Sequence, residues 1–154
     1  MNEKQIFNKF KKIRTETLNE VRDLPNNIID LIPEGFSNNI RWNLGHILVG
    51  WDHGIFPNIK LERRESLHYH TIFPKGTVPK ECWGDEPVFK EIVSNLENQL
   101  ESIIENSKGK LEQPLIVPFI PRVKTIKNMF QFHIKHEEHH LECIRKIKQI
   151  LINE

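Results

Sequence analysis

The chain has 154 residues, of which 38% are apolar and 28% charged, and a net charge of +1. These values are ordinary for one soluble globular domain, and they exclude the strongly basic surface that nucleic acid or an anionic membrane would need. No apolar run is long enough to span a bilayer, the first residues lack a signal region, and Cys82 and Cys143 lack redox or zinc-finger spacing, so we expect a cytoplasmic protein.

Helical periodicity dominates the first half of the chain, and no segment has the two-residue alternation of a strand. The first predicted helix runs from about Glu3 to Asp23 and ends before Pro25. The second begins near Asn39 and ends near Phe56, and a long connection over residues 58–84 follows it.

The second half predicts two more helices. The third helix begins in the segment GDEPVFKE, where Asp85 is the predicted N-cap and Pro87 lies in the first turn, and it runs to about Asn106. A proline-rich loop separates it from the fourth helix, which begins near Thr125 and continues almost to the last residue. Four amphipathic helices predict an all-α protein with a single four-helix-bundle domain over residues 1–154.

The fourth predicted helix carries histidines on its inward face. Its heptad positions follow steps of 4 and 3: Met129, His133, His136, His140, Cys143, Ile147 and Ile150. Such positions face a bundle interior and normally hold leucine or isoleucine. His139 lies beside this row, and we expect it to be exposed.

The second predicted helix repeats the pattern with Trp42, His46, Val49, His53 and Phe56. A single inward histidine is usually a hydrogen-bonded core residue, because its burial without a partner is costly. Five inward histidines on two helices favour a metal site over that reading. His136 and His140 are four residues apart, so they can chelate one ion from one helix face.

The segment HEEHH also fits the H-E-x-x-H pattern of zinc metalloproteases. The extended form of that pattern requires Gly and His where this chain has Cys143 and Lys146. The carboxylates that follow the motif, Glu142 and Glu154, are not well placed as a third ligand. A third ligand must therefore come from upstream, and the second helix offers His46.

Two segments, RWNLGHILVGWDH and HEEHHLEC, resemble the histidine signatures of the DinB/YfiT-like superfamily. The resemblance implies an up-down-down-up bundle with a long crossover between the second and third helices. It also implies that His46, His136 and His140 hold a divalent metal ion. With that order of helices, His53 would lie toward His133, and a homodimer is expected by analogy.

Three neutral imidazoles leave an open coordination position, as catalytic sites do. We expect zinc by ligand type, with nickel, manganese and iron as alternatives. Members of the family that the chain resembles include transferases and isomerases that use small thiols such as bacillithiol or mycothiol, and others described as hydrolases. Three hypotheses follow for this chain: an enzyme that activates a small thiol for transfer to an electrophile, a hydrolase that uses metal-bound hydroxide, and a non-enzymatic, metal-stabilised binding or stress-response protein.

Several neighbouring residues are candidates for supporting roles. We expect His53 and His133 either to contact the metal ligands or the substrate, or to be hydrogen-bonded residues in the wall of the site. Asn43 lies one turn before His46 and is expected to orient it. Glu137 is a candidate proton acceptor beside the ligands. The remaining expectations are apolar packing for Trp42 and Trp51, solvent exposure for Asp52, and burial for Cys82. Cys143 is expected in the core, with a role as fourth ligand as the alternative.

Overall fold

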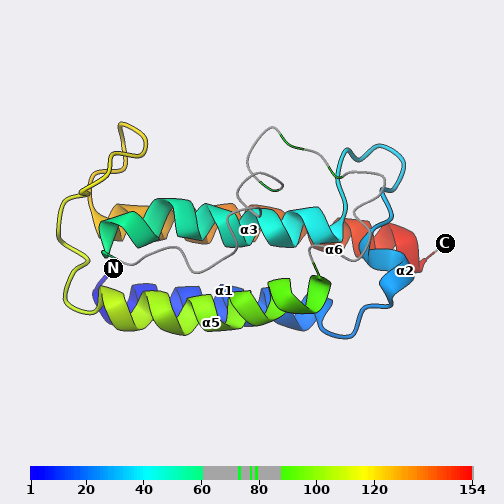
Figure 1. The fold of residues 1–154 in the computed structure, drawn as a ribbon, viewed down its shortest axis with the longest axis horizontal. Helices are drawn as coiled ribbons and strands as arrows, with labels where there is room; N and C mark the ends of the chain where they lie inside the picture. The colour runs from blue at the N-terminus through cyan, green and yellow to red at the C-terminus, as the bar shows by residue number, and fades with distance from the viewer. Residues whose placement is uncertain (61–72, 74–76, 78, 80–87, 154) are drawn as a thin grey trace.

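The computed structural model describes residues 1–60, 73, 77, 79 and 88–153, and this part of the chain is a bundle of four long helices (Figure 1). They are α1 (Glu3–Val21), α3 (Ile40–Ile55), α5 (Phe89–Ser107) and α6 (Ile126–Ile152), with a short α2 (Asn26–Ile29) and a 3-10 turn η1 (Phe56–Asn58). Within the described residues there is no strand, only an isolated bridge between Pro114 and Thr125. The predicted all-α bundle is therefore confirmed.

Helices α1 and α6 run in the same direction, and α3 and α5 run in the opposite one, as the colours of Figure 1 show. Along α1 and α6, Phe7 contacts Phe130 near one end, and Glu20 pairs with Arg145 near the other. No described helix has the length and apolar character needed to cross a membrane. The predicted long crossover between α3 and α5 lies mostly outside the described residues.

Side-chain caps explain where three of the long helices begin. The Asn2 side chain accepts a hydrogen bond from the Gln5 backbone amide, and the Gln5 side chain accepts one from the Asn2 backbone amide, forming a capping box. Asn39 and Thr125 accept bonds from backbone amides in the first turns of α3 and α6. These polar residues satisfy amides that have no partner within the helix, so they fix its first turn.

The start of α5 differs from the prediction. The helix begins at Phe89, and its N-cap residue, Val88, makes no side-chain cap bond. The predicted cap Asp85, the first-turn Pro87 and the loop residue Cys82 lie outside the described residues. The short helix α2 was not predicted, because four residues are too few to show a helical period.

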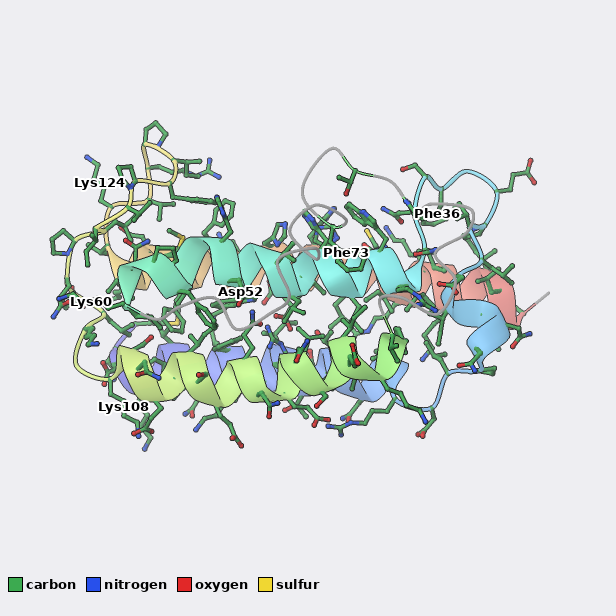
Figure 2. The ribbon with its side chains drawn as sticks, viewed as in Figure 1. Phe36, Asp52, Lys60, Phe73, Lys108 and Lys124 are labelled. Atoms are coloured by element: carbon green, nitrogen blue, oxygen red, sulfur yellow. The ribbon has the colours of Figure 1, made fainter. Side chains whose placement is uncertain are left out.

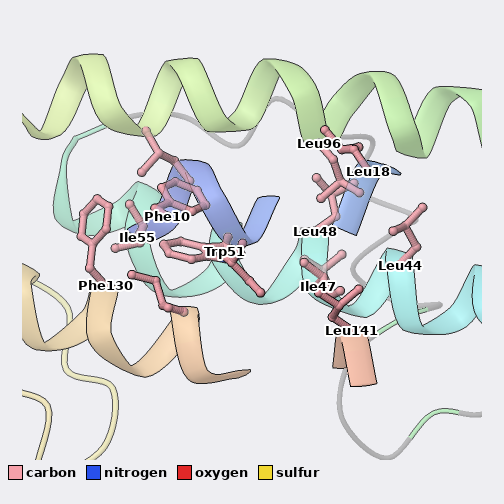
Figure 3. Close-up of a cluster of buried hydrophobic side chains, with 14 of the residues drawn as sticks. Phe10, Leu18, Leu44, Ile47, Leu48, Trp51, Ile55, Leu96, Phe130 and Leu141 are labelled. Atoms are coloured by element: carbon pink, nitrogen blue, oxygen red, sulfur yellow. The ribbon is translucent and has the colours of Figure 1, made fainter. Parts of the chain in front are cut away.

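The core contains two neighbouring groups of apolar side chains (Figure 3). In one, the ring of Trp51 stacks on Phe10 with centroids 4.0 Å apart and meets the edge of Phe130 at 5.6 Å. The other gathers leucines from all four long helices: Leu18, Leu44, Leu48, Leu96 and Leu141. Helix α3 contributes to both groups, and nearly every one of its residues is buried. It has the largest share of buried residues among the four long helices.

A buried ion pair joins the helices between these apolar groups. Arg14 of α1 and Glu137 of α6 are both fully buried, with Nη2 and Oε1 2.8 Å apart. Trp51 of α3 donates a 2.9 Å hydrogen bond to the same carboxylate, and Thr17 lies 2.9 Å from its other oxygen. Arg14 also donates to the backbone carbonyl of Leu96 in α5. One network thus involves all four long helices.

Removing one side of this ion pair should be costly, because it leaves a buried charge without its counter-ion. We expect Arg14→Met to lower the free energy of unfolding by about 3–5 kcal/mol, measured by urea denaturation. Arg22→Met is the matched control, since Arg22 and Glu97 form a pair that is about half exposed. Such pairs contribute less than about 1 kcal/mol. Equal losses in both variants would contradict a special role for the buried pair.

Candidate metal centre

Three histidines from two helices converge at one point in the bundle. His46 comes from α3, and His136 and His140 come from successive turns of α6. One ring nitrogen from each lies within 4.8 Å of the others, and the Nε2 atoms of His46 and His136 are 3.2 Å apart. Two imidazole nitrogens on one tetrahedral zinc ion are about 3.3 Å apart, from bond lengths of 2.0–2.1 Å. The spacing therefore suits a shared divalent ion.

The imidazole of His46 is fixed by its surroundings. Its Nδ1 lies 2.6 Å from the backbone oxygen of Phe73, which can only accept, so the proton is on Nδ1 and Nε2 carries a lone pair. The indole of Trp42 stacks on the ring at 4.7 Å. The ring of Phe73 lies against Gly45, where an added Cβ would come within 2.5 Å of it, and Figure 2 shows Phe73 beside α3. Glycine at position 45 thus permits the contact that brings the Phe73 carbonyl to His46.

The imidazole of His140 is fixed in the same way by Asn43. Its Nδ1 lies 2.8 Å from Asn43 Oδ1. The amide nitrogen of Asn43 donates to the Asn38 side chain and to the Asn39 carbonyl, so the amide oxygen is the acceptor for His140. The proton of His140 is therefore on Nδ1, which leaves Nε2 free to bind a metal. Asn43 contacts His140, and not His46 as the sequence had suggested, because its amide projects across to α6.

His136 and its neighbour His133 lack such partners. The Nδ1 atom of His136 and both ring nitrogens of His133 are buried and have no hydrogen-bond partner within the described residues. His133 is 2% exposed, and its ring contacts Trp51, Phe119 and Phe132. His133 therefore lies in an apolar wall beside the three converging histidines.

The exposure of three other polar candidates can be compared with the prediction, which was wrong for two of them. His53 is exposed, not inward. The face of α3 that meets α6 passes through Gly50 and Gly54, and His53 points about 100° around the helix from Gly54. Asp52 is fully buried, not solvated, and accepts a 2.9 Å hydrogen bond from Gln99, in the layer between α3 and α5 (Figure 2). His139 is exposed, as predicted.

Two further candidates do not join the histidine group. Glu137 lies next to His136 in sequence, but its carboxylate is turned toward α1 and is bound by Arg14 and Trp51. Cys143 is half-buried and is not part of the group that could hold an ion. The group found within the described residues consists of histidines alone.

Burial keeps these imidazoles neutral. It is the main cause that lowers the pKa of His136 to about 4 and that of His140 to about 2. It also lowers the pKa of His46, although the hydrogen bond to Phe73 opposes this effect. Burial again dominates for His133, whose pKa falls to about 3 with smaller effects from His136 and His53. All four rings are therefore neutral at pH 7, which is the form that binds metals.

These shifts predict how the stability of the metal-free protein depends on pH. The unfolded chain binds protons on His133, His136 and His140 below pH 6.5, whereas the folded chain does not bind them until the pH approaches 4 or less. Stability should thus be full above pH 6.5 and fall as the pH decreases from there. Each histidine contributes a slope of about 1.4 kcal/mol per pH unit.

The measurement is urea denaturation of chelator-treated protein between pH 7 and pH 5. His133→Phe should have a shallower slope, by one proton, because that histidine can no longer be protonated in the unfolded chain. Parallel curves for the two proteins would contradict the lowered pKa of His133.

Comparison with known families agrees with this geometry. A search among curated proteins gives no match. The family model described as the DinB superfamily matches residues 9–144, a segment that begins in α1, ends in α6 and includes all three converging histidines. Because the match covers most of the chain, this protein belongs to the DinB superfamily.

Proposed function

We propose that this chain is a divalent-metal-dependent enzyme that activates a small thiol for transfer to an electrophile, with His46, His136 and His140 as the metal ligands. The convergence of three neutral imidazoles within 4.8 Å carries the proposal. Three protein ligands are typical of catalytic centres, in which one position stays open for substrate. A divalent ion bound there supplies Lewis-acid chemistry, which lowers the pKa of a coordinated thiol so that it becomes a nucleophile near neutral pH.

The surroundings of the three histidines favour a thiol over a water as the nucleophile. Hydrolysis benefits from a carboxylate base near the ion, and the nearest candidate in sequence, Glu137, is bound by Arg14 and Trp51. An ion held by His46, His136 and His140 would itself lower the pKa of a coordinated thiol, so thiol transfer would need no such base. In the overall transfer, sulfur would form a bond to the electrophile, the leaving group would depart with the bonding electrons, and the thiol proton would pass to solvent. Soft sulfur also suits zinc, which we propose as the ion.

Metal content tests the ligand assignment directly. We expect wild-type protein to bind about one divalent ion per chain. His46→Ala, His136→Ala and His140→Ala should each abolish or strongly weaken binding, because two remaining histidines form an incomplete site. Elemental analysis after gel filtration measures the ratio of metal to protein.

His139→Ala is the matched control, because His139 is an exposed histidine next to a proposed ligand in sequence. It should retain the full metal content. The assignment is wrong if all four variants contain as much metal as the wild-type protein.

Turnover assays test the proposed reaction. Zinc-loaded protein should conjugate at least one member of a thiol panel (bacillithiol, mycothiol, coenzyme A, cysteine) to a chloronitroaromatic electrophile. The same preparation should not hydrolyse a panel of nitrophenyl esters. Conjugation should be lost in His46→Ala and kept in His139→Ala. Ester hydrolysis without conjugation would favour a hydrolase, and inactivity in both assays would favour a non-enzymatic binding protein.

A further inference from the structure

The backbone of Gly50 in α3 lies beside two buried ring nitrogens. A Cβ added at Gly50 would lie 3.6 Å from Nδ1 of His136 and 4.0 Å from Nδ1 of His133, with His136 Cε1 at 3.4 Å. These are ordinary van der Waals distances, so an alanine methyl group would fit here. Because glycine has no side chain, no Cβ occupies this position, and a water molecule near it would have a polar partner on either side.

The same two nitrogens lack protein partners. Nδ1 of His136 and Nδ1 of His133 are buried without a hydrogen bond to any described residue. The other two proposed ligands differ, since His46 donates to a carbonyl and His140 to an amide oxygen. Metal-bound histidines usually donate their second ring N–H to such an acceptor, which fixes the tautomer. His136 is thus the proposed ligand whose acceptor is missing from the protein.

Metal binding makes that acceptor necessary. The proton of His46 is on Nδ1, so its Nε2 accepts the 3.2 Å hydrogen bond from Nε2 of His136 in the metal-free protein. To bind an ion through Nε2, His136 must carry its proton on Nδ1 instead. A buried N–H at that position without an acceptor would weaken metal binding.

We propose that His133 supplies this acceptor through one water molecule held at Gly50, and that it is a positioning residue for the metal ligand His136. The water accepts from Nδ1–H of His136 and donates to Nδ1 of His133. The opposite edge of the His133 ring lies directly against α3, because an added Cβ at Gly54 would collide with its Nε2. Two glycines one turn apart thus accommodate the ring, with Nδ1 of His133 beside Gly50 and Nε2 packed against Gly54. This inference rests on the proposed metal site.

Three replacements of His133 separate a role in positioning from a role in packing. Asparagine places a polar atom near the position of Nδ1, glutamine places one near Nε2, and phenylalanine fills the wall without polar atoms. We expect His133→Asn to bind zinc within about threefold of wild type. His133→Gln and His133→Phe should bind about 10–100-fold more weakly, as is typical when the partner of a metal-bound histidine is lost. The dissociation constants are measured on the full chain by competition with a chelator.

Gly50→Ala tests the water itself. Its methyl group would make only ordinary van der Waals contacts, so the metal-free protein should melt near the wild-type temperature. The methyl group would compete with the water for the position beside the two nitrogens, so zinc affinity should fall by about 10–100-fold. Nitrogen-15 spectra of zinc-loaded protein should show a slowly exchanging proton on Nδ1 of His136 in wild type and His133→Asn. That proton should exchange rapidly in Gly50→Ala and His133→Phe.

The outcomes distinguish this inference from the proposed function. Wild-type protein that binds no zinc would overturn both. If wild type binds zinc but Asn, Gln and Phe at position 133 all bind equally, or if Gly50→Ala binds as tightly as wild type, the metal site stands and the water-mediated contact is overturned.

Discussion

The direction in which α6 presents its histidines depends on the buried contact between Arg14 and Glu137. Glu137 directly follows His136, and successive residues of a helix point about 100° apart. Holding the carboxylate against α1 therefore turns His136 and His140 toward α3. A buried ion pair often stabilises a fold no more than apolar residues of similar volume would. Here its contribution is orientation, because the same residue that joins four helices also sets the rotation of the helix that carries two proposed ligands.

Much of the fold and the three converging histidines could be predicted from sequence, because both depend on local pattern. Proline and polar capping residues mark helix ends, and the spacing of His136 and His140 places them on one face of one helix. The burial of Asp52 could not be predicted, since α3 is enclosed on several sides and a two-sided pattern of apolar and polar residues does not apply to it. Nor could that of Arg14, whose partner Glu137 lies 123 residues away.

The chemistry of the site depends on hydrogen bonds that sequence reasoning assigned incorrectly or missed. The position of each imidazole proton follows from its partner, and those partners are a carbonyl from beyond α3 for His46 and an amide from the facing helix for His140. The position of Glu137 in the HEEHH motif suggests a catalytic base, but in the fold its carboxylate accepts hydrogen bonds from Arg14 and Trp51. Motif spacing thus located the proposed ligands. It could not show which ring nitrogen of each ligand carries the proton, or that the carboxylate of Glu137 is bound elsewhere.

The hydrogen bond between His46 and position 73 is made by the main chain, and this has a consequence for how the centre tolerates change. Every amino acid carries the same carbonyl, so exchanging the phenylalanine would keep the acceptor wherever the chain still follows its path over Gly45. Substitution scans would therefore report a merely apolar position. An acceptor that sets the tautomer of a proposed ligand would escape detection by any method that varies only side chains.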